Sequence, residues 1–169
     1  MLTYHPSTDF FHCWMRFAAL LLDCESQGIE LDRIRIIDFL LCFPHEIAAC
    51  RLPAEHSVTL RHHIRQIPRS YEDASSIRQG FSQMRRIQGH VAMDMVAKGI
   101  VRRDEYREGI LIPNAQPSTC ELLKAIAEKW EIRNHEWYPL AVSFLRSIPL
   151  NGKDGLKDRS SLLEFRYDE

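Results

Sequence analysis

Apolar residues recur at helical spacing along most of the chain, beginning near its N-terminal end. Residues 8–27 carry them at the i, i+3, i+4 and i+7 positions of an amphipathic helix with a wide buried face: Phe10, Phe11, Trp14, Phe17, Ala18 and Leu21. Thr8 and Asp9 suit the cap of this helix, and Gly28 suits its end. A second helix is expected over residues 31–43, because Pro44 cannot continue it.

The pattern then predicts a series of shorter helices and one long one. We expect helices over residues 46–50, 54–66, 74–98, 118–130 and 135–147, separated by prolines and polar stretches. Gly80 and Gly89 lie inside the long helix, and each weakens it by up to about 1 kcal/mol relative to alanine.

The periodicity changes directly after the long helix. Ile100–Arg103 and Gly109–Ile112 resemble two short strands, and the polar residues 104–107 resemble the turn between them. A helix followed at once by a hairpin is the order of a winged-helix unit. We therefore predict a mainly α fold with a short β-hairpin: a single helical domain over residues 1–150, with a winged-helix-like part around residues 55–113.

Composition agrees with a globular protein and adds little chemistry. The 169 residues are 45% hydrophobic and 27% charged, with a formal net charge of −1, which suits a single domain without a strong general attraction to nucleic acid or membranes. The longest apolar run, residues 17–22, is far shorter than the roughly 20 residues that cross a bilayer. The five cysteines are an odd number among apolar neighbours, and no signal-peptide pattern is present, so we expect reduced thiols and a cytoplasmic location.

Motifs for catalysis, metal binding and cofactor binding are missing from the sequence. There is no Cys-x-x-Cys pair, no Gly-x-Ser-x-Gly elbow and no glycine-rich phosphate loop. The close pairs Cys42-x-x-His45 and His62-His63 are interpreted as packing or surface residues, and a small metalloenzyme is the least favoured reading. Asp32 and Asp38 are expected on one exposed helix stripe beside arginines. The prediction is a protein that is not an enzyme and has no catalytic, metal-binding or cofactor-binding residues.

Charge is distributed unevenly along the chain. Residues 1–60 carry four basic and eight acidic side chains, whereas residues 61–108 carry ten basic and six acidic ones. The basic stretch includes arginines of the predicted long helix and wing that could contact DNA phosphates: Arg78, Arg85, Arg86, Arg102 and Arg103. A solvated surface or an acidic protein partner explains the same charges equally simply.

The C-terminal segment, residues 151–169, is predicted to be a flexible joint followed by a docking segment. Its apolar residues stand at the end of the chain, where polar residues usually predominate, and they must pack either on the chain's own core or on a partner. The candidate partner-binding residues are Arg159, Leu162, Leu163, Phe165, Arg166 and Tyr167.

Several sequence blocks resemble a known family. Tyr4-His5-Pro6 followed by Phe11-His12-Cys13, residues 31–39 closing at Phe43-Pro44, and Ala97–Ile100 leading to Gly109-Ile110 are similar to the middle component of ABC-three component systems of the Lamassu type, which are bacterial anti-phage defence operons. The similarity spans nearly the whole chain and rests mainly on the block from Leu31 to Pro44.

This resemblance implies an accessory, or adaptor, subunit without catalytic residues. Its partners would be an SMC/Rad50-like ABC ATPase and an effector, often a nuclease, encoded nearby, and the subunit would bridge the two, with DNA contact within the complex as a further use of the basic stretch. The alternative is a stand-alone winged-helix regulator that binds DNA through the same arginines. That alternative predicts salt-sensitive binding and a symmetric dimer.

Overall fold

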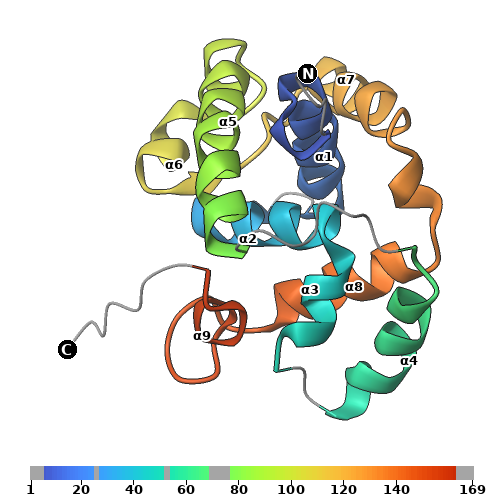
Figure 1. Cartoon of the computed structure of the whole chain (residues 1–169). Coiled ribbons are helices and arrows are strands. Elements are labelled where there is room, and N and C mark those ends of the chain that lie inside the picture. Colours follow the sequence, from blue (N-terminus) through green and yellow to red (C-terminus); the bar gives the residue numbers. More distant parts are fainter. Residues whose placement is uncertain (1–5, 25–26, 52–53, 69–76, 163–169) are drawn as a thin grey trace, which may run out of the picture.

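The computed structural model describes residues 6–24, 27–51, 54–68 and 77–162, and it is mainly helical (Figure 1). The α-helices in these ranges are α1 (Phe10–Cys24), α2 (Leu31–Cys42), α3 (Pro44–Ala49), α4 (Ala54–Arg65), α5 (Ile77–Ala97), α6 (Arg103–Arg107), α7 (Pro117–Ala127), α8 (Trp137–Ser147) and α9 (Leu156–Ser160). Short 3-10 helices precede α1 and α8: η1 (Pro6–Thr8) and η3 (Glu131–Asn134). The prediction of a mainly α fold is confirmed, as are the main helical segments.

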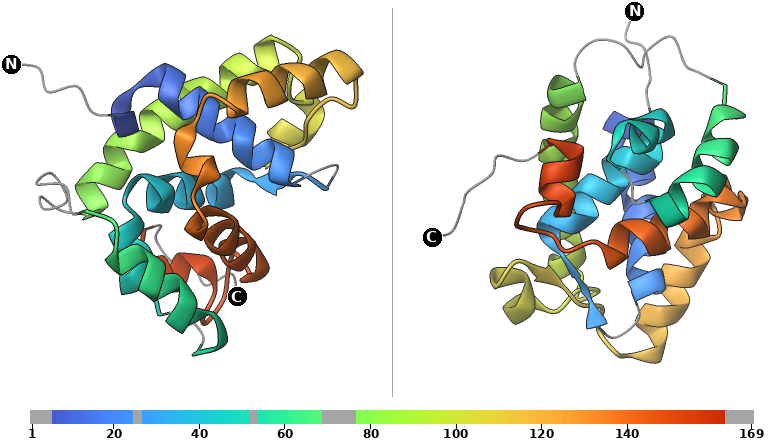
Figure 2. Two further views of the ribbon diagram at one scale, coloured as in Figure 1. Left: turned by 90° about the vertical axis from the view of Figure 1, so that its right-hand side faces the viewer. Right: turned by 90° about the horizontal axis from the view of Figure 1, so that it is seen from below.

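Helix α2 lies at the centre of the molecule. Helices α1, α5 and α7 pack on one side of it, while α3, α4, α8 and α9 lie on the other side (Figures 1 and 2). This position explains why α2 buries apolar residues around most of its circumference rather than along one stripe: Ile34, Ile36, Ile37, Phe39, Leu40 and Leu41.

Helix α1 begins as the sequence predicts, and most of its predicted apolar stripe is buried: Trp14, Phe17, Ala18 and Leu21. The backbone N–H of His12 donates to Oδ1 of Asp9 at 2.8 Å, which caps the first turn. The expectation that Phe11 joins the buried stripe is wrong, because its side chain is 75% exposed. The buried face is wider than this stripe and also includes Cys13, Arg16 and Leu20, since α5 and α7 both pack against this helix.

The sequence pattern also predicted the wrong exposure for one charged residue of α2. Asp32 is partly exposed, as expected, but Asp38 is completely buried. Asp38 faces Arg16 of α1, and its Oδ1 accepts from Nε of Arg16 at 2.5 Å. Nε2 of Gln88, on α5, donates to Oδ2 of Asp38 at 2.8 Å. The expected exposed stripe therefore contributes an ion pair that joins α1, α2 and α5 inside the core.

The predicted hairpin is only part of what the segments after α5 form. Strand β2 (Ile110–Leu111) pairs antiparallel with β1 (Ile29–Glu30), which lies about 80 residues earlier in the chain. Residues 104–107, expected as a turn, belong to helix α6. The two predicted strand segments still meet antiparallel at a bridge between Val101 and Pro113. The N–H of Arg102 donates to the carbonyl of Ile112 at 2.9 Å, and the N–H of Asn114 donates to the carbonyl of Ile100 at 2.8 Å. Because α6 lies between these segments and β2 pairs with β1, a winged-helix-like part is not confirmed.

The cysteines are free thiols, and most of them are shielded from solvent. Cys13, Cys24 and Cys50 are buried, Cys42 is half-buried and Cys120 is exposed. Burial raises the pKa of Cys24 to about 11 and the pKa of Cys50 to about 12, well above the ordinary value of a cysteine thiol. The buried thiols are therefore protonated and poorly nucleophilic at neutral pH.

Replacing Asp38 tests the buried ion pair. Asp38→Asn should lower the free energy of unfolding by about 3–5 kcal/mol, because Arg16 then keeps a buried charge without a carboxylate. Denaturant titration followed by circular dichroism measures this loss. Asp104→Asn is the matched control, since Asp104 is 90% exposed and pairs only with Arg107 on the same helix; a loss of equal size in both variants would contradict the assignment.

The buried thiols predict a fall in stability at alkaline pH. Above pH 9 the thiols of the unfolded chain ionise while those of the folded chain stay protonated, so the unfolded state binds fewer protons and gains stability as the pH rises. We expect each buried thiol to lower the free energy of unfolding by about 1.4 kcal/mol between pH 8 and pH 10. Denaturant titrations at both pH values measure the fall, and a Cys50→Ala variant should show a smaller one.

Candidate functional site

The described part of the C-terminal segment packs on the body of the molecule. The side chain of Leu156 is completely buried. Nζ of Lys157 lies 2.9 Å from Oδ2 of Asp32, on α2, and Nη2 of Arg51 lies 2.8 Å from Oδ1 of Asp158. Helix α9 is therefore held by an apolar anchor and by ion pairs to two different parts of the chain.

A turn before α9 brings this segment back onto the core. The N–H of Leu156 donates to the carbonyl of Pro149 at 2.7 Å, and the N–H of Gly155 donates to the carbonyl of Gly152 at 3.1 Å. A Cβ atom on Gly155 would lie only 2.4 Å from the carbonyl oxygen of Asn151, so this tight approach requires glycine. The predicted joint thus forms a closed turn.

The candidate partner-binding residues fall into two groups. Leu162 is 9% exposed and belongs to the chain's own hydrophobic core, while Arg159 donates to the carbonyl oxygens of Asp154 and Arg51. The other four candidates lie outside the described residues: Leu163, Phe165, Arg166 and Tyr167. Their docking on a partner stays a prediction.

The candidate DNA-binding arginines do not form one continuous group. Arg85 and Arg86 are exposed near the middle of α5, and the side chain of Arg78 lies outside the described part of the structure. Helix α5 ends about three helical turns after Arg86, and Arg102 and Arg103 follow that end. Nη1 of Arg102 pairs with Oε1 of Glu105 at 3.1 Å, so part of the positive charge there is already neutralised.

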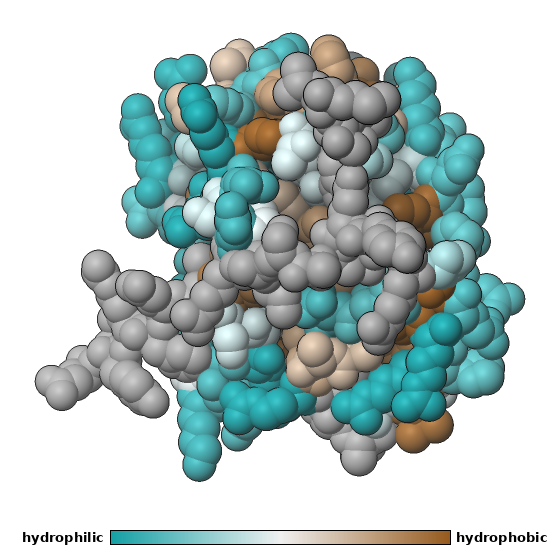
Figure 3. All heavy atoms as spheres, viewed as in Figure 1, coloured by the Kyte–Doolittle hydropathy of each residue, from teal (hydrophilic) through white to brown (hydrophobic). Residues whose placement is uncertain are grey.

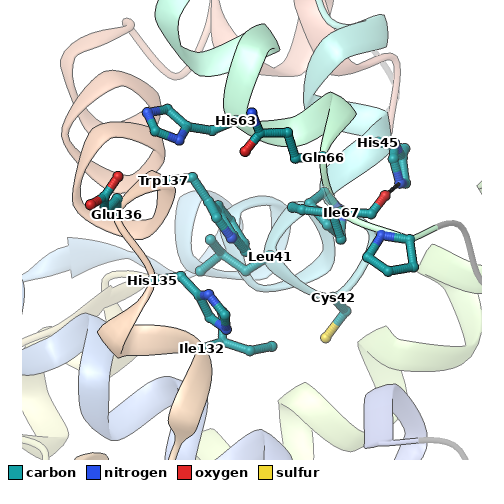
Figure 4. Close-up of a pocket in the computed structure, with 12 residues that line it drawn as sticks. Leu41, Cys42, His45, His63, Gln66, Ile67, Ile132, His135, Glu136 and Trp137 are labelled. Carbon is teal, nitrogen blue, oxygen red and sulfur yellow. Dashed lines mark hydrogen bonds between the residues drawn. The ribbon is translucent and has the colours of Figure 1, made fainter.

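A hollow of about 610 Å³ between α2–α3, α4 and the start of α8 is a candidate site (Figure 4). Its apolar lining includes Leu41, Ile67 and Trp137, and polar side chains surround it. Nε2 of His45 is 3.0 Å from the carbonyl oxygen of Ile67. Apolar walls with a polar rim suit a projecting side chain of a partner or a small ligand.

The sequence identified only part of this hollow. Cys42 and His45 appeared as a close pair, but His135 and Glu136 reach the same hollow from about 90 residues later, which no local spacing could reveal. Despite these residue types, no group of three or more His, Cys, Asp or Glu side chains among the described residues is arranged to hold a metal ion. The hollow has the character of a binding surface.

A second hollow of about 610 Å³ lies where α8 meets the end of α1. Asp23 there accepts from Nη2 of Arg133 at 3.0 Å and from the hydroxyl of Tyr138 at 2.7 Å, and Nη1 of Arg146 donates to its backbone carbonyl. Burial and the nearby carboxylate of Asp23 raise the pKa of Tyr138, so its hydroxyl stays a donor. This network explains the attachment of η3 and α8 to α1.

Comparison with known proteins identifies one family. The family model described as ABC-three component (ABC-3C) system Middle Component 5 matches residues 2–168, which is nearly the whole chain. No curated protein and no solved structure matches this chain. In the described ranges, no helix has both the length and the apolar character needed to span a membrane.

The attachment of α9 can be tested by shortening its buried anchor. Leu156→Ala should lower the free energy of unfolding by about 2–5 kcal/mol, because the site cannot collapse fully around the smaller side chain. Leu140→Ala on α8 is the control, since Leu140 is 42% exposed and its truncation should cost much less. Thermal unfolding of both variants gives the comparison, and equal losses would show that α9 is not anchored as described.

Proposed function

The chain belongs to the ABC-three component system Middle Component 5 family, and we propose that it is a non-catalytic adaptor between an SMC/Rad50-like ABC ATPase and an effector, often a nuclease. The complex would act in bacterial anti-phage defence, as Lamassu-type operons do. The single observation that carries this proposal is the family match over residues 2–168, because it leaves almost no part of the chain outside the middle component.

The physical form of the molecule supports a bridging role. Helix α2 separates two groups of helices that share one core (Figure 2), so partners bound on opposite sides would be held in a defined relation. The hollow beside His45 and the basic residues of α5 and α6 lie on different sides of α2 and offer separate contact surfaces. Bridging of this kind can transmit a state of the ATPase only if the adaptor binds one of its states more tightly than another.

The stand-alone winged-helix regulator remains the competing function. It uses the arginines of α5 and α6 for DNA, and the antiparallel contact of Val101 with Pro113 is the part of the described structure that most resembles its wing. However, Arg102 and Arg107 are each paired with a carboxylate of α6, which reduces the charge available for a phosphate backbone.

Co-purification tests the adaptor proposal directly. The tagged chain, expressed together with the products of its neighbouring genes, should be recovered in a stable complex that contains a large ABC ATPase. Size-exclusion chromatography with light scattering gives its mass. Elution of the chain alone, as a dimer that shifts duplex DNA at low salt, would contradict the adaptor function and support the regulator.

A truncation locates the docking segment in the same assay. Removing residues 163–169 takes away Leu163, Phe165, Arg166 and Tyr167 but keeps the buried Leu156 and Leu162. We expect the truncated chain to fold with an unchanged midpoint temperature and to lose the complex. Leu140→Ala serves as a control that should retain it. A fully retained complex in the truncated chain would mean that docking uses another surface.

A further inference from the structure

Basic side chains outnumber the acidic side chains that pair with them where α2 crosses α5. The side chain of Arg35, on α2, is 16% exposed, and its Nη1 lies 3.6 Å from Oδ1 of Asp32. The same carboxylate also pairs with Lys157 at the shorter distance of 2.9 Å. Two cations therefore share one anion, and the closer contact belongs to Lys157.

The guanidinium of Arg35 lies across the backbone of α5. A Cβ atom on Gly89 would be 3.7 Å from Nη2 of Arg35, and the backbone carbonyl of Arg35 accepts from Nε2 of Gln88 at 3.1 Å. Nε of Arg35 and Oε1 of Gln88 are both buried here, and neither has a hydrogen-bond partner among the described residues. An orphaned donor of this kind costs free energy unless the surroundings supply compensating negative charge.

Arg85 adds a second guanidinium at the same place. It is exposed and lies one helical turn before Gly89, on the same side of α5. No carboxylate pairs with it in the described structure. Burial lowers the pKa of Arg35, and the positive charge of Arg85 lowers that pKa further, as two nearby like charges require.

Three basic side chains at the end of α5 and in and next to α6 are each paired with a carboxylate. Lys98 pairs with Asp94, Arg102 with Glu105, and Arg107 with Asp104. Hydrophilic side chains predominate over α5 and α6 on the face shown in Figure 3. Arg35, Arg85 and Lys157 of α9, together with the shared carboxylate of Asp32, carry a net charge of +2. The buried Asp38 of α2 is paired with Arg16 and adds no net charge.

We propose that Arg35 and Arg85 bind one phosphate group at the crossing of α2 and α5. Two guanidiniums from different helices can donate to different oxygens of a tetrahedral oxyanion, and Arg–phosphate contacts of this kind are strong. Inorganic phosphate or a phosphate monoester carries close to two negative charges at neutral pH and matches the net charge of the cluster. A phosphodiester of a nucleic-acid backbone carries one negative charge and neutralises half of it. The phosphate belongs either to a nucleic-acid backbone or to a free phosphate compound, and this site does not depend on the bridging function proposed above.

Thermal unfolding of the full chain in sodium phosphate tests the site. Phosphate at tens of millimolar should raise the midpoint temperature by about 3–5 °C over sodium chloride of equal ionic strength. Arg85→Gln should abolish that rise, and it should also raise the midpoint in chloride alone, because it removes the repulsion of Arg35. Arg86→Gln is the matched control: the same charge is lost from the next residue, which points about 100° away around the helix.

The comparison of the two variants decides the proposal. A rise in phosphate that persists in Arg86→Gln and disappears in Arg85→Gln supports it. An equal response of both variants, or no rise in the unmodified chain, would overturn it, because a general effect of phosphate on protein stability does not distinguish adjacent arginines.

A second arm identifies the source of the phosphate. Fluorescence anisotropy with a labelled DNA duplex at 50 mM salt compares the unmodified chain with both variants. If a nucleic-acid backbone supplies the group, Arg85→Gln weakens binding several-fold more than Arg86→Gln does, and inorganic phosphate competes. If the duplex does not bind while the thermal response is present, the site takes a free phosphate compound.

Discussion

The buried ion pair between Arg16 and Asp38 is the constraint on which the arrangement of the helices depends. A carboxylate with no exposure to solvent can stay inside the core only when its oxygens accept hydrogen bonds from closely placed donors. Arg16 supplies these from α1 and Gln88 from α5. The remaining donors of Arg16 reach the carbonyl of Pro6 at 2.9 Å, which ties η1 to the same point. Apolar packing would tolerate several relative positions of these helices, whereas this network accepts few.

A second arginine performs the corresponding task on the other side of α2. Nη1 of Arg33 donates to the carbonyl oxygens of Leu145 and Ile148 at 3.2 and 2.6 Å, where the end of α8 leaves its last carbonyls without helical partners. Nε of Arg33 is held by Glu30 at 2.7 Å, and this hydrogen bond lowers the pKa of the Glu30 carboxyl. Helix α2 is therefore joined by polar contacts to both groups of helices, and the surfaces they carry are fixed relative to each other.

This construction suits the adaptor function proposed above. The described residues offer hollows and charged surfaces, and their buried polar groups serve packing: Asp38 joins helices, Tyr138 anchors α8, and the buried thiols are kept protonated. The family assignment to a middle component agrees with this use of buried polar groups for packing. Arg35 and Gln88 are exceptions, since Nε of Arg35 and Oε1 of Gln88 are buried without a hydrogen-bond partner among the described residues. An unsatisfied guanidinium donor with a second arginine nearby is the feature that directs attention to a bound anion.

The sequence by itself determined the local structure and the family. Apolar spacing, the cap at Asp9 and the stop at Pro44 depend on neighbouring residues, so helices such as α1 and α2 could be predicted, and the block from Leu31 to Pro44 carried the resemblance. Contacts between distant residues were decided only by the tertiary structure. Asp38 looks like a surface residue until α5 covers it, and Phe11 looks buried, although no packed helix covers it and it stays exposed at the edge of the buried face of α1. Strand β2 pairs with β1 because Leu111 reaches the core beside Ile29. Helical and strand periodicity record which side of an element is apolar, but the partner that covers a side is selected by packing of the whole chain.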